Sequence, residues 1–123
     1  MAIAEMGFYG SGGELVASGI ETPSTSSPTI LECGFKPKRI LIGVKVTLNT
    51  KKIMVHYYDE EITGTTSYNR QYYDGQAYNT TVAIPYDSTS ASTDIIINIT
   101  STGFVYGKAS SNFNYPIWWY AEG

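Results

Sequence analysis

The tyrosines of this 123-residue chain are concentrated in one segment, where a binding site could form. Seven of the eleven lie between Tyr57 and Tyr86, among acids, amides and an arginine. Aromatic rings stack on sugar rings, and carboxylates and amides hydrogen-bond to hydroxyls, so this composition is what a carbohydrate site requires. Pairing of tyrosines between strands, or a subunit interface, explains the same residues more simply. The residues in question are Tyr57, Asp59, Tyr68, Arg70, Tyr72, Tyr73, Asp74, Tyr78 and Asn79.

The sequence offers few reagents for catalysis. Cys33 is the only cysteine and His56 the only histidine, and no flanking signature supports a thiol and imidazole pair, so we interpret Cys33 as a half-buried structural thiol. The sequence contains no HExxH, CxxC, GxSxG or glycine-rich phosphate loop. A small hydrolase using acids near Asp59 and Asp74 is the weakest alternative, because adjacent acids do not fix the carboxylate separation that glycoside hydrolysis needs. We expect no catalytic residue, metal site or cofactor.

Charge and the amino terminus exclude two classes of partner. The net charge is −3 and 15% of the residues are charged, so the chain lacks the basic field that nucleic-acid binding requires. Six of its eight cations lie in residues 36–52, where they are typical of strand edges and turns. The amino terminus has neither a positively charged start nor a sustained apolar run, which predicts no signal peptide and no membrane insertion.

The elements that would position these side chains are predicted to be strands. Apolar residues do not recur at helical spacing in any window of ten or more residues, whereas alternating runs are frequent. The longest follows Pro37 and places Ile40, Ile42, Val44, Val46 and Leu48 on one face. The expected strands are residues 14–20, 29–34, 38–49, 52–59, 65–74, 76–86, 94–101, 103–108 and 113–121.

About eight or nine strands with turns between them predict an all-β, antiparallel β-sandwich. We expect one domain over residues 1–123, with residues 1–13 as an extended N-terminal arm.

Alternation along each strand also predicts which side chains share a face of the sheet. Ile53, Val55 and Tyr57 share one face, as do Ile95, Ile97 and Ile99, with Ile96 an exception to the pattern.

The two adjacent tryptophans must face opposite ways on the last strand. Trp119 shares the parity of Ile117 and is the expected core residue, which leaves Trp118 and Tyr120 on the outer face. Exposed aromatic surface usually marks a contact surface, so Trp118 and Tyr120 are expected near subunit contacts. The hairpin from Tyr68 to Tyr78 is expected at the exposed distal end.

Three segments carry a family resemblance. They are the corner and strand at residues 34–42, beginning Gly-Phe-Lys-Pro, the segment Thr-Gly-Phe-Val-Tyr-Gly at 102–107, and the ending Ile-Trp-Trp-Tyr-Ala-Glu-Gly at 117–123. In type and order they resemble small structural proteins of bacteriophages and prophages. The same order is similar, more distantly, to the H-type lectin domain, a β-sandwich that forms trimers.

The resemblance implies an H-type-lectin-like or jelly-roll-like sandwich, a place in a virion as a decoration, fibre-head or adhesion module, and contacts with other virion proteins. It also implies a homo-oligomer, with a trimer favoured. The alternative is a lectin-like module that recognises a cell-surface glycan. The sugar-contacting pattern of the lectin family cannot be placed within residues 103–112, so none of its residues is assigned here.

Overall fold

The computed structural model describes residues 8–9, 15–45, 53–62, 67–73, 78–85, 95–109 and 115–123. The described residues contain strands and no helix, which confirms the all-β prediction. The ten strands are β1 (Phe8–Tyr9), β2 (Leu15–Glu21), β3 (Thr29–Glu32), β4 (Arg39–Lys45), β5 (Ile53–Asp59), β6 (Ser67–Tyr73), β7 (Tyr78–Pro85), β8 (Ile96–Ile99), β9 (Gly103–Tyr106) and β10 (Ile117–Glu122). Nine correspond to expected strands, and β1 lies within the expected N-terminal arm.

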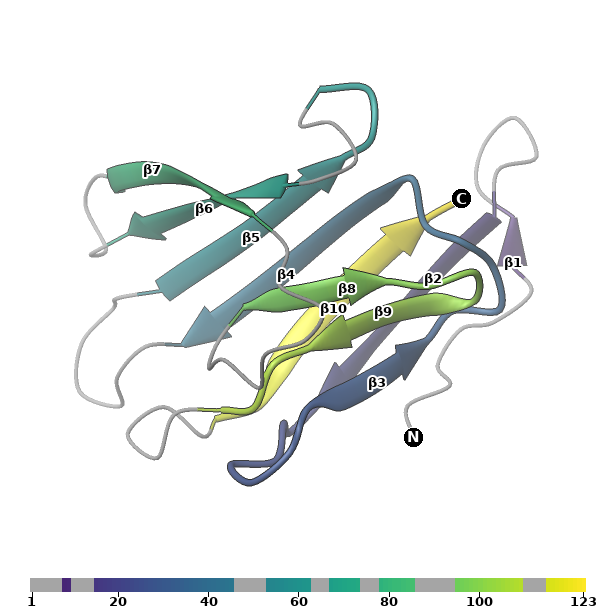
Figure 1. Cartoon of the computed structure of the whole chain (residues 1–123), viewed down its shortest axis with the longest axis horizontal. Helices are drawn as coiled ribbons and strands as arrows, with labels where there is room; N and C mark the ends of the chain where they lie inside the picture. The colour runs from purple at the N-terminus through teal and green to yellow at the C-terminus, as the bar shows by residue number, and fades with distance from the viewer. Residues whose placement is uncertain are drawn as a thin grey trace.

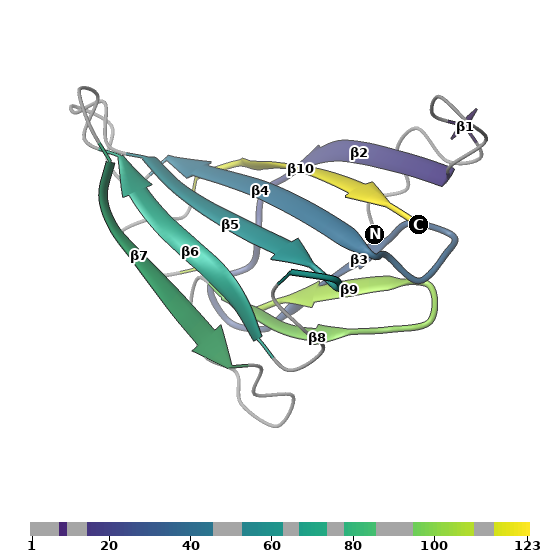
Figure 2. The ribbon, with the colours of Figure 1, turned by 90° about the horizontal axis from the view of Figure 1, so that it is seen from above.

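The strands form two antiparallel sheets that lie over one another. The large sheet has the order β1-β2-β10-β4-β5-β6-β7, and the small sheet has the order β3-β9-β8. Figure 1 shows the small sheet in front of β10 and its neighbours, and Figure 2 shows the two layers from the side, with β6 and β7 curving away from the rest of the large sheet. The last strand of the chain, β10, therefore lies in the interior of the large sheet, between β2 and β4.

The turn before β4 has a defined cause in the sequence. Gly34 has a φ of 87°, a left-handed conformation that glycine adopts without steric cost. The buried Pro37 then restricts the chain just before the strand begins. Along β4, Ile40, Ile42 and Val44 are buried at 0–2% exposure, as alternation predicts. Val46 and Leu48 lie outside the described residues.

The core fills the space between the sheets. Trp119 of β10 is 1% exposed, and its ring meets that of Phe104 of β9 edge-on at a centroid distance of 5.7 Å. The prediction that Trp119 belongs to the core is therefore confirmed. Other large side chains of this core are Leu31, Ile40, Ile42, Ile96, Tyr68, Tyr106 and Ile117.

Simple alternation fails along β8. Ile96 pairs with Tyr106 and Ile99 with Phe104, because the register shifts between Ile96 and Asn98. This irregularity places Ile96 in the core at 0% exposure and leaves Ile95 and Ile99 only partly buried. Ile97 is buried at 4%, as predicted, but it lies at the irregularity. The expected shared face of Ile95, Ile97 and Ile99 is therefore wrong.

The three segments of the family resemblance lie next to one another. The backbone N–H groups of Cys33 and Gly34 both donate to the carbonyl oxygen of Thr102, at 2.8 and 3.0 Å. The N–H of Lys38 donates to the carbonyl of Glu122 at 2.7 Å. A Cβ on Gly123 would lie 2.5 Å from Cδ2 of Phe35, so the chain end packs against the corner. These short segments depend on each other for packing although they are distant in sequence.

Candidate functional site

One face of the large sheet is turned away from the small sheet, and we call it the outer face. The ladder pairs place its residues in rows across the strands. The first row is Val16, Glu122, Arg39 and Asp59; the second is Ser18, Tyr120, Leu41 and Tyr57; the third is Ile20, Trp118, Gly43 and Val55; and the fourth contains Lys45 and Ile53.

The two middle rows of the outer face are mostly apolar and contain four exposed side chains, those of Ile20, Tyr57, Trp118 and Tyr120. Trp118 is 48% exposed and Tyr120 37%, which confirms that both face outward. Among the described residues, five of the seven large apolar side chains that are exposed lie on this face. These five are Ile20, Ile53, Tyr57, Trp118 and Tyr120. A contiguous exposed apolar patch of this kind is typical of an interaction surface.

Gly43 determines how Trp118 lies on the sheet. The two residues are paired between β4 and β10, and a Cβ on Gly43 would overlap Nε1 and Cε2 of the Trp118 indole. The ring therefore occupies the space that any other residue at position 43 would fill. Beside it is a groove lined by Ser18, Gly19, Ile20, Leu41, Trp118, Trp119 and Tyr120.

The first row of the outer face is ionic. Nε of Arg39 lies 3.2 Å from Oδ2 of Asp59, and its Nη1 lies 3.7 Å from Oε2 of Glu122. The Tyr57 hydroxyl donates to Oδ2 of Asp59 at 3.4 Å, and the Glu61 N–H donates to Oδ1 at 2.9 Å. Burial raises the pKa of Asp59, but the hydrogen bonds from Glu61 and Arg39 outweigh it and keep that pKa below its usual value.

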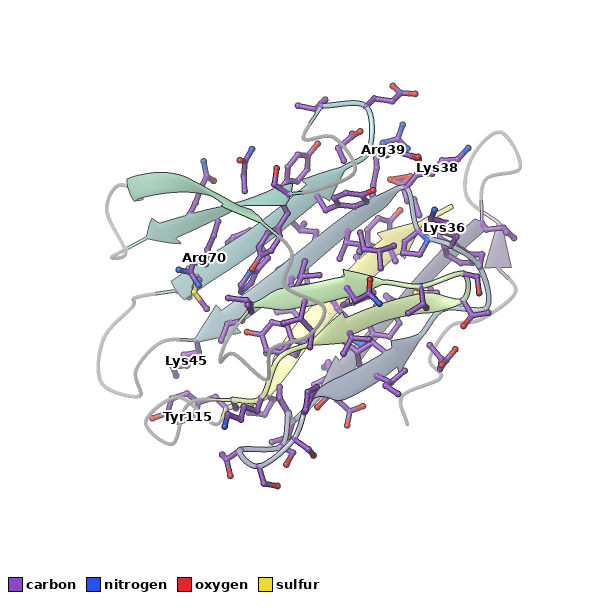
Figure 3. All side chains as sticks on the ribbon, in the orientation of Figure 1. Lys36, Lys38, Arg39, Lys45, Arg70 and Tyr115 are labelled. Carbon is purple, nitrogen blue, oxygen red and sulfur yellow. The ribbon has the colours of Figure 1, made fainter. Side chains whose placement is uncertain are left out.

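Lys45 lies at the other end of β4. Figure 3 shows Arg39 and Lys45 at opposite ends of this strand. Lys45 is exposed and shares the parity of Arg39, Leu41 and Gly43, so it belongs to the outer face. Lys36 and Lys38 lie at the Arg39 end (Figure 3), in the corner before the strand begins. The outer face thus has an ionic end, an apolar middle and an end marked by Lys45.

The predicted carbohydrate residues do not form one surface. Tyr57 and Asp59 lie on the outer face. Tyr68, in contrast, is 0% exposed and belongs to the core, so its expected role as a sugar-stacking residue is wrong. Arg70 pairs with the buried His56 on the opposite face from Tyr57.

The rest of that predicted set lies on β6, on β7 or outside the described residues. Tyr72 pairs with Met54, and Tyr73 with Ile53 and Tyr78. Asn79 falls where the register shifts between β6 and β7. Asp74 lies outside the described residues, so the predicted distal position of the whole hairpin stays a prediction.

Tyr68 has a structural role that the sequence did not indicate. Its hydroxyl oxygen accepts a hydrogen bond of 3.0 Å from the backbone N–H of Ile96. It thereby joins β6 of the large sheet to β8 of the small sheet. A buried N–H group at a sheet edge needs such a partner.

His56 lies beside this connection, between two tyrosines. Its ring centroid is 5.4 Å from that of Tyr68 and 5.5 Å from that of Tyr106, and its Nε2 is 3.5 Å from the Tyr106 hydroxyl. Burial lowers the pKa of His56 to about 3, and the positive charge of Arg70 acts in the same direction. The imidazole is therefore neutral near pH 7 and functions as a core residue.

Cys33 is also a core residue. It is 1% exposed, and burial, together with the charge of Glu32, raises the pKa of its thiol to about 12. A thiol in this environment stays protonated and does not act as a nucleophile. The predicted structural role is consistent with this, although Cys33 is more deeply buried than expected.

Metal binding and membrane spanning are two further possibilities for the described part of the chain. Within it, no group of three or more His, Cys, Asp or Glu side chains is arranged to hold a metal ion. The same residues include no helix of the length and apolarity needed to cross a membrane. Neither finding adds a candidate to the outer face.

The sequence indicated only part of the outer face. Trp118, Tyr120, Tyr57 and Asp59 were expected to be functional, whereas Leu41 and Ile20 were not. Leu41 is an apolar residue among the alternate β4 positions that are otherwise not aliphatic, and this is the signal that could have identified it.

Comparison with protein-family models, curated proteins and solved structures finds no match.

Proposed function

We propose that this chain is a non-enzymatic structural protein of a bacteriophage or prophage virion that acts through homo-oligomeric assembly. The observation that carries the assembly proposal is the exposed apolar middle of the outer face. Placement in a virion is supported by the resemblance of the corner, the 102–107 segment and the C-terminal strand. The H-type-lectin-like or jelly-roll-like form of the sandwich, and contacts with other virion proteins, belong to the same proposal.

The outer face differs from what a two-layer sandwich ordinarily presents to water. Antiparallel sheets with one solvated face carry polar residues on that face. Here the two middle rows carry Trp118, Tyr120 and Tyr57, and tryptophan and tyrosine are enriched at protein interfaces. Covering this surface with another protein would remove the apolar side chains from water.

The carbohydrate-binding alternative has less support. A sugar site needs an aromatic platform with several polar groups that converge on the hydroxyls. The groove beside Trp118 is lined mainly by apolar groups, and the carboxylates of the ionic end, Asp59 and Glu122, are engaged with Arg39. The predicted tyrosines are also divided, because Tyr68 is buried in the core.

Two measurements test the proposed function. Sedimentation equilibrium of the wild-type chain at micromolar concentration is expected to give an oligomer, and a monomer would contradict assembly. Mass spectrometry of particles sedimented from lysates of the organism that encodes the chain is expected to detect it as a particle component. Its absence from such particles, with the chain present in the remaining lysate, would contradict the virion role.

A further inference from the structure

The outer face carries features that complement each other. Its ionic end holds two carboxylates, Asp59 and Glu122, and one guanidinium, Arg39, which together carry one net negative charge. Its other end holds the exposed Lys45. Between them, Trp118 lies over Gly43 beside the groove lined by Ser18, Leu41 and Tyr120. The surface thus carries a negative end and a positive end, and both a large aromatic ring and a groove. Such a surface can bind a second copy of itself.

The arrangement of the rows selects one symmetry. Packed sheets keep their strands within about 30° of alignment, so a two-fold axis in the contact plane runs either along the strands or across them. An axis along the strands would keep each row over the same row of the other copy, so the net negative ionic end would face another ionic end. An axis across the strands brings the fourth row of one copy over the first row of the other, so that Lys45 lies over Arg39, with Glu122 and Asp59 on either side and one net negative charge in that row.

The same axis also matches the apolar rows. It brings the third row of one copy over the second row of the other, since these rows are adjacent on β10 and β4. Trp118 of each copy then meets the Tyr120 and Leu41 positions of its partner, at the groove. Each Lys45 then faces a row whose net charge is negative, and the exposed aromatic rings leave water together.

We infer that two copies of this chain pair through their outer faces, with β10 lying over β10 in opposite directions, Trp118 in the partner's groove and Lys45 at the partner's ionic end. This inference rests on the proposed function, because it specifies how the assembly forms. It gives an even-numbered assembly with closed pairs. A trimer, which the family resemblance implies, would need contacts of a different kind.

The apolar contact is tested by Trp118→Ser, with Ile30→Ser as its matched control. Ile30 is 55% exposed on β3 of the small sheet, close to the 48% of Trp118, but it is not on the outer face. Because Trp118 would be central and buried in the pair, its loss is expected to weaken the dimer by at least about 100-fold in Kd. Ile30→Ser is expected to leave Kd within about twofold, and circular dichroism checks that both variants fold.

The charge contact is tested by reversal and rescue. Lys45→Glu would face a row with a net negative charge, and Glu122→Lys would make that row net positive against Lys45, so each single variant is expected to weaken the dimer roughly five- to tenfold. The double variant restores opposite charges and is expected to recover nearly wild-type Kd. Glu32→Lys makes the same charge change as Glu122→Lys on β3 of the small sheet, off the outer face, and is expected to have little effect. Raising the salt concentration should weaken the wild-type dimer and flatten these differences.

The outcomes separate this inference from the proposed function. A wild-type monomer at micromolar concentration contradicts both. An oligomer that Trp118→Ser leaves intact, or a trimer, overturns the paired outer faces while homo-oligomeric assembly stands. A dimer that needs Trp118 but shows no rescue by the Lys45→Glu, Glu122→Lys double variant overturns the arrangement of the two copies.

Discussion

The inner and outer faces of the large sheet use the same residue types for different purposes. Trp118 and Trp119 are consecutive, yet one is 48% exposed and the other 1%. Trp119 packs against Phe104 of the small sheet, whereas Trp118 lies over Gly43 at the surface. The Trp119 ring therefore packs between the two sheets. The Trp118 ring packs against the large sheet alone, so its other side is open to a partner.

The tyrosines divide in the same way. On the inner side, Tyr68 and Tyr106 contact His56 and connect the sheets. On the outer side, the Tyr57 hydroxyl contacts Asp59 at the surface. Tyrosine has an apolar ring and a polar tip, so its role depends on whether the tip meets a buried backbone group or the exposed edge of the sheet.

The largest effect on the free energy of unfolding is expected when the inner tryptophan, Trp119, is replaced. Trp119→Ala should lower the free energy of unfolding by about 3 to 5 kcal/mol, because the substitution leaves a cavity between the two sheets. Urea titration at neutral pH measures this. A loss below about 0.5 kcal/mol, typical of exposed positions, would mean that the inner face is not packed as described.

Acid should weaken the inner face through His56. Its pKa is about 3 in the folded chain and about 6.5 when exposed, so the unfolded state binds an additional proton between these values. Stability from the neutral imidazole is thus fully present above pH 6.5 and falls as the pH decreases towards 3. By pH 4.5 the loss should be on the order of 2 to 3 kcal/mol.

The control for this pH effect is His56→Phe, which keeps an aromatic ring between Tyr68 and Tyr106. Carboxylates such as Asp59 titrate in both proteins, so the difference between the two unfolding curves isolates the histidine. Urea titrations at several pH values measure it. A difference that is independent of pH would show that His56 is not buried in its neutral form.

A smaller effect is expected when one tyrosine hydroxyl is removed. Tyr68→Phe leaves the buried N–H of Ile96 without the bond seen here, which should cost about 1 to 2 kcal/mol. Tyr57→Phe removes a hydroxyl from the outer face and should change stability by less than about 0.5 kcal/mol. Equal losses for the two variants would remove the distinction between inner and outer tyrosines.

The smallest effect on stability is expected for the outer tryptophan. In solutions dilute enough to contain only monomer, Trp118→Ala should change the free energy of unfolding by less than about 0.5 kcal/mol. Urea titration across a dilution series measures this, alongside Trp119→Ala. A loss as large as that for Trp119 would show that Trp118 stabilises the single chain rather than presenting a surface.

Much of the secondary structure could be predicted from the sequence, because strand alternation is a local property. It identified the buried face of β4 and the opposite directions of Trp118 and Trp119. It could not decide which parity of β5 is buried. Ile53, Val55 and Tyr57 share a face as expected, but that face is the outer one, and Met54, His56 and Tyr58 point to the core.

What the sequence alone determined is therefore the class of fold and the side-chain directions within its regular strands. The tertiary structure decided which strands are neighbours. Placing β10 between β2 and β4 puts Trp118 over Gly43 and brings Arg39 between Asp59 and Glu122. It also decided that Tyr68 is a core residue and that Ile96 is buried in the core as well as Ile97. These features depend on pairing between residues distant in the chain, and the pattern along one strand does not say which other strand lies beside it.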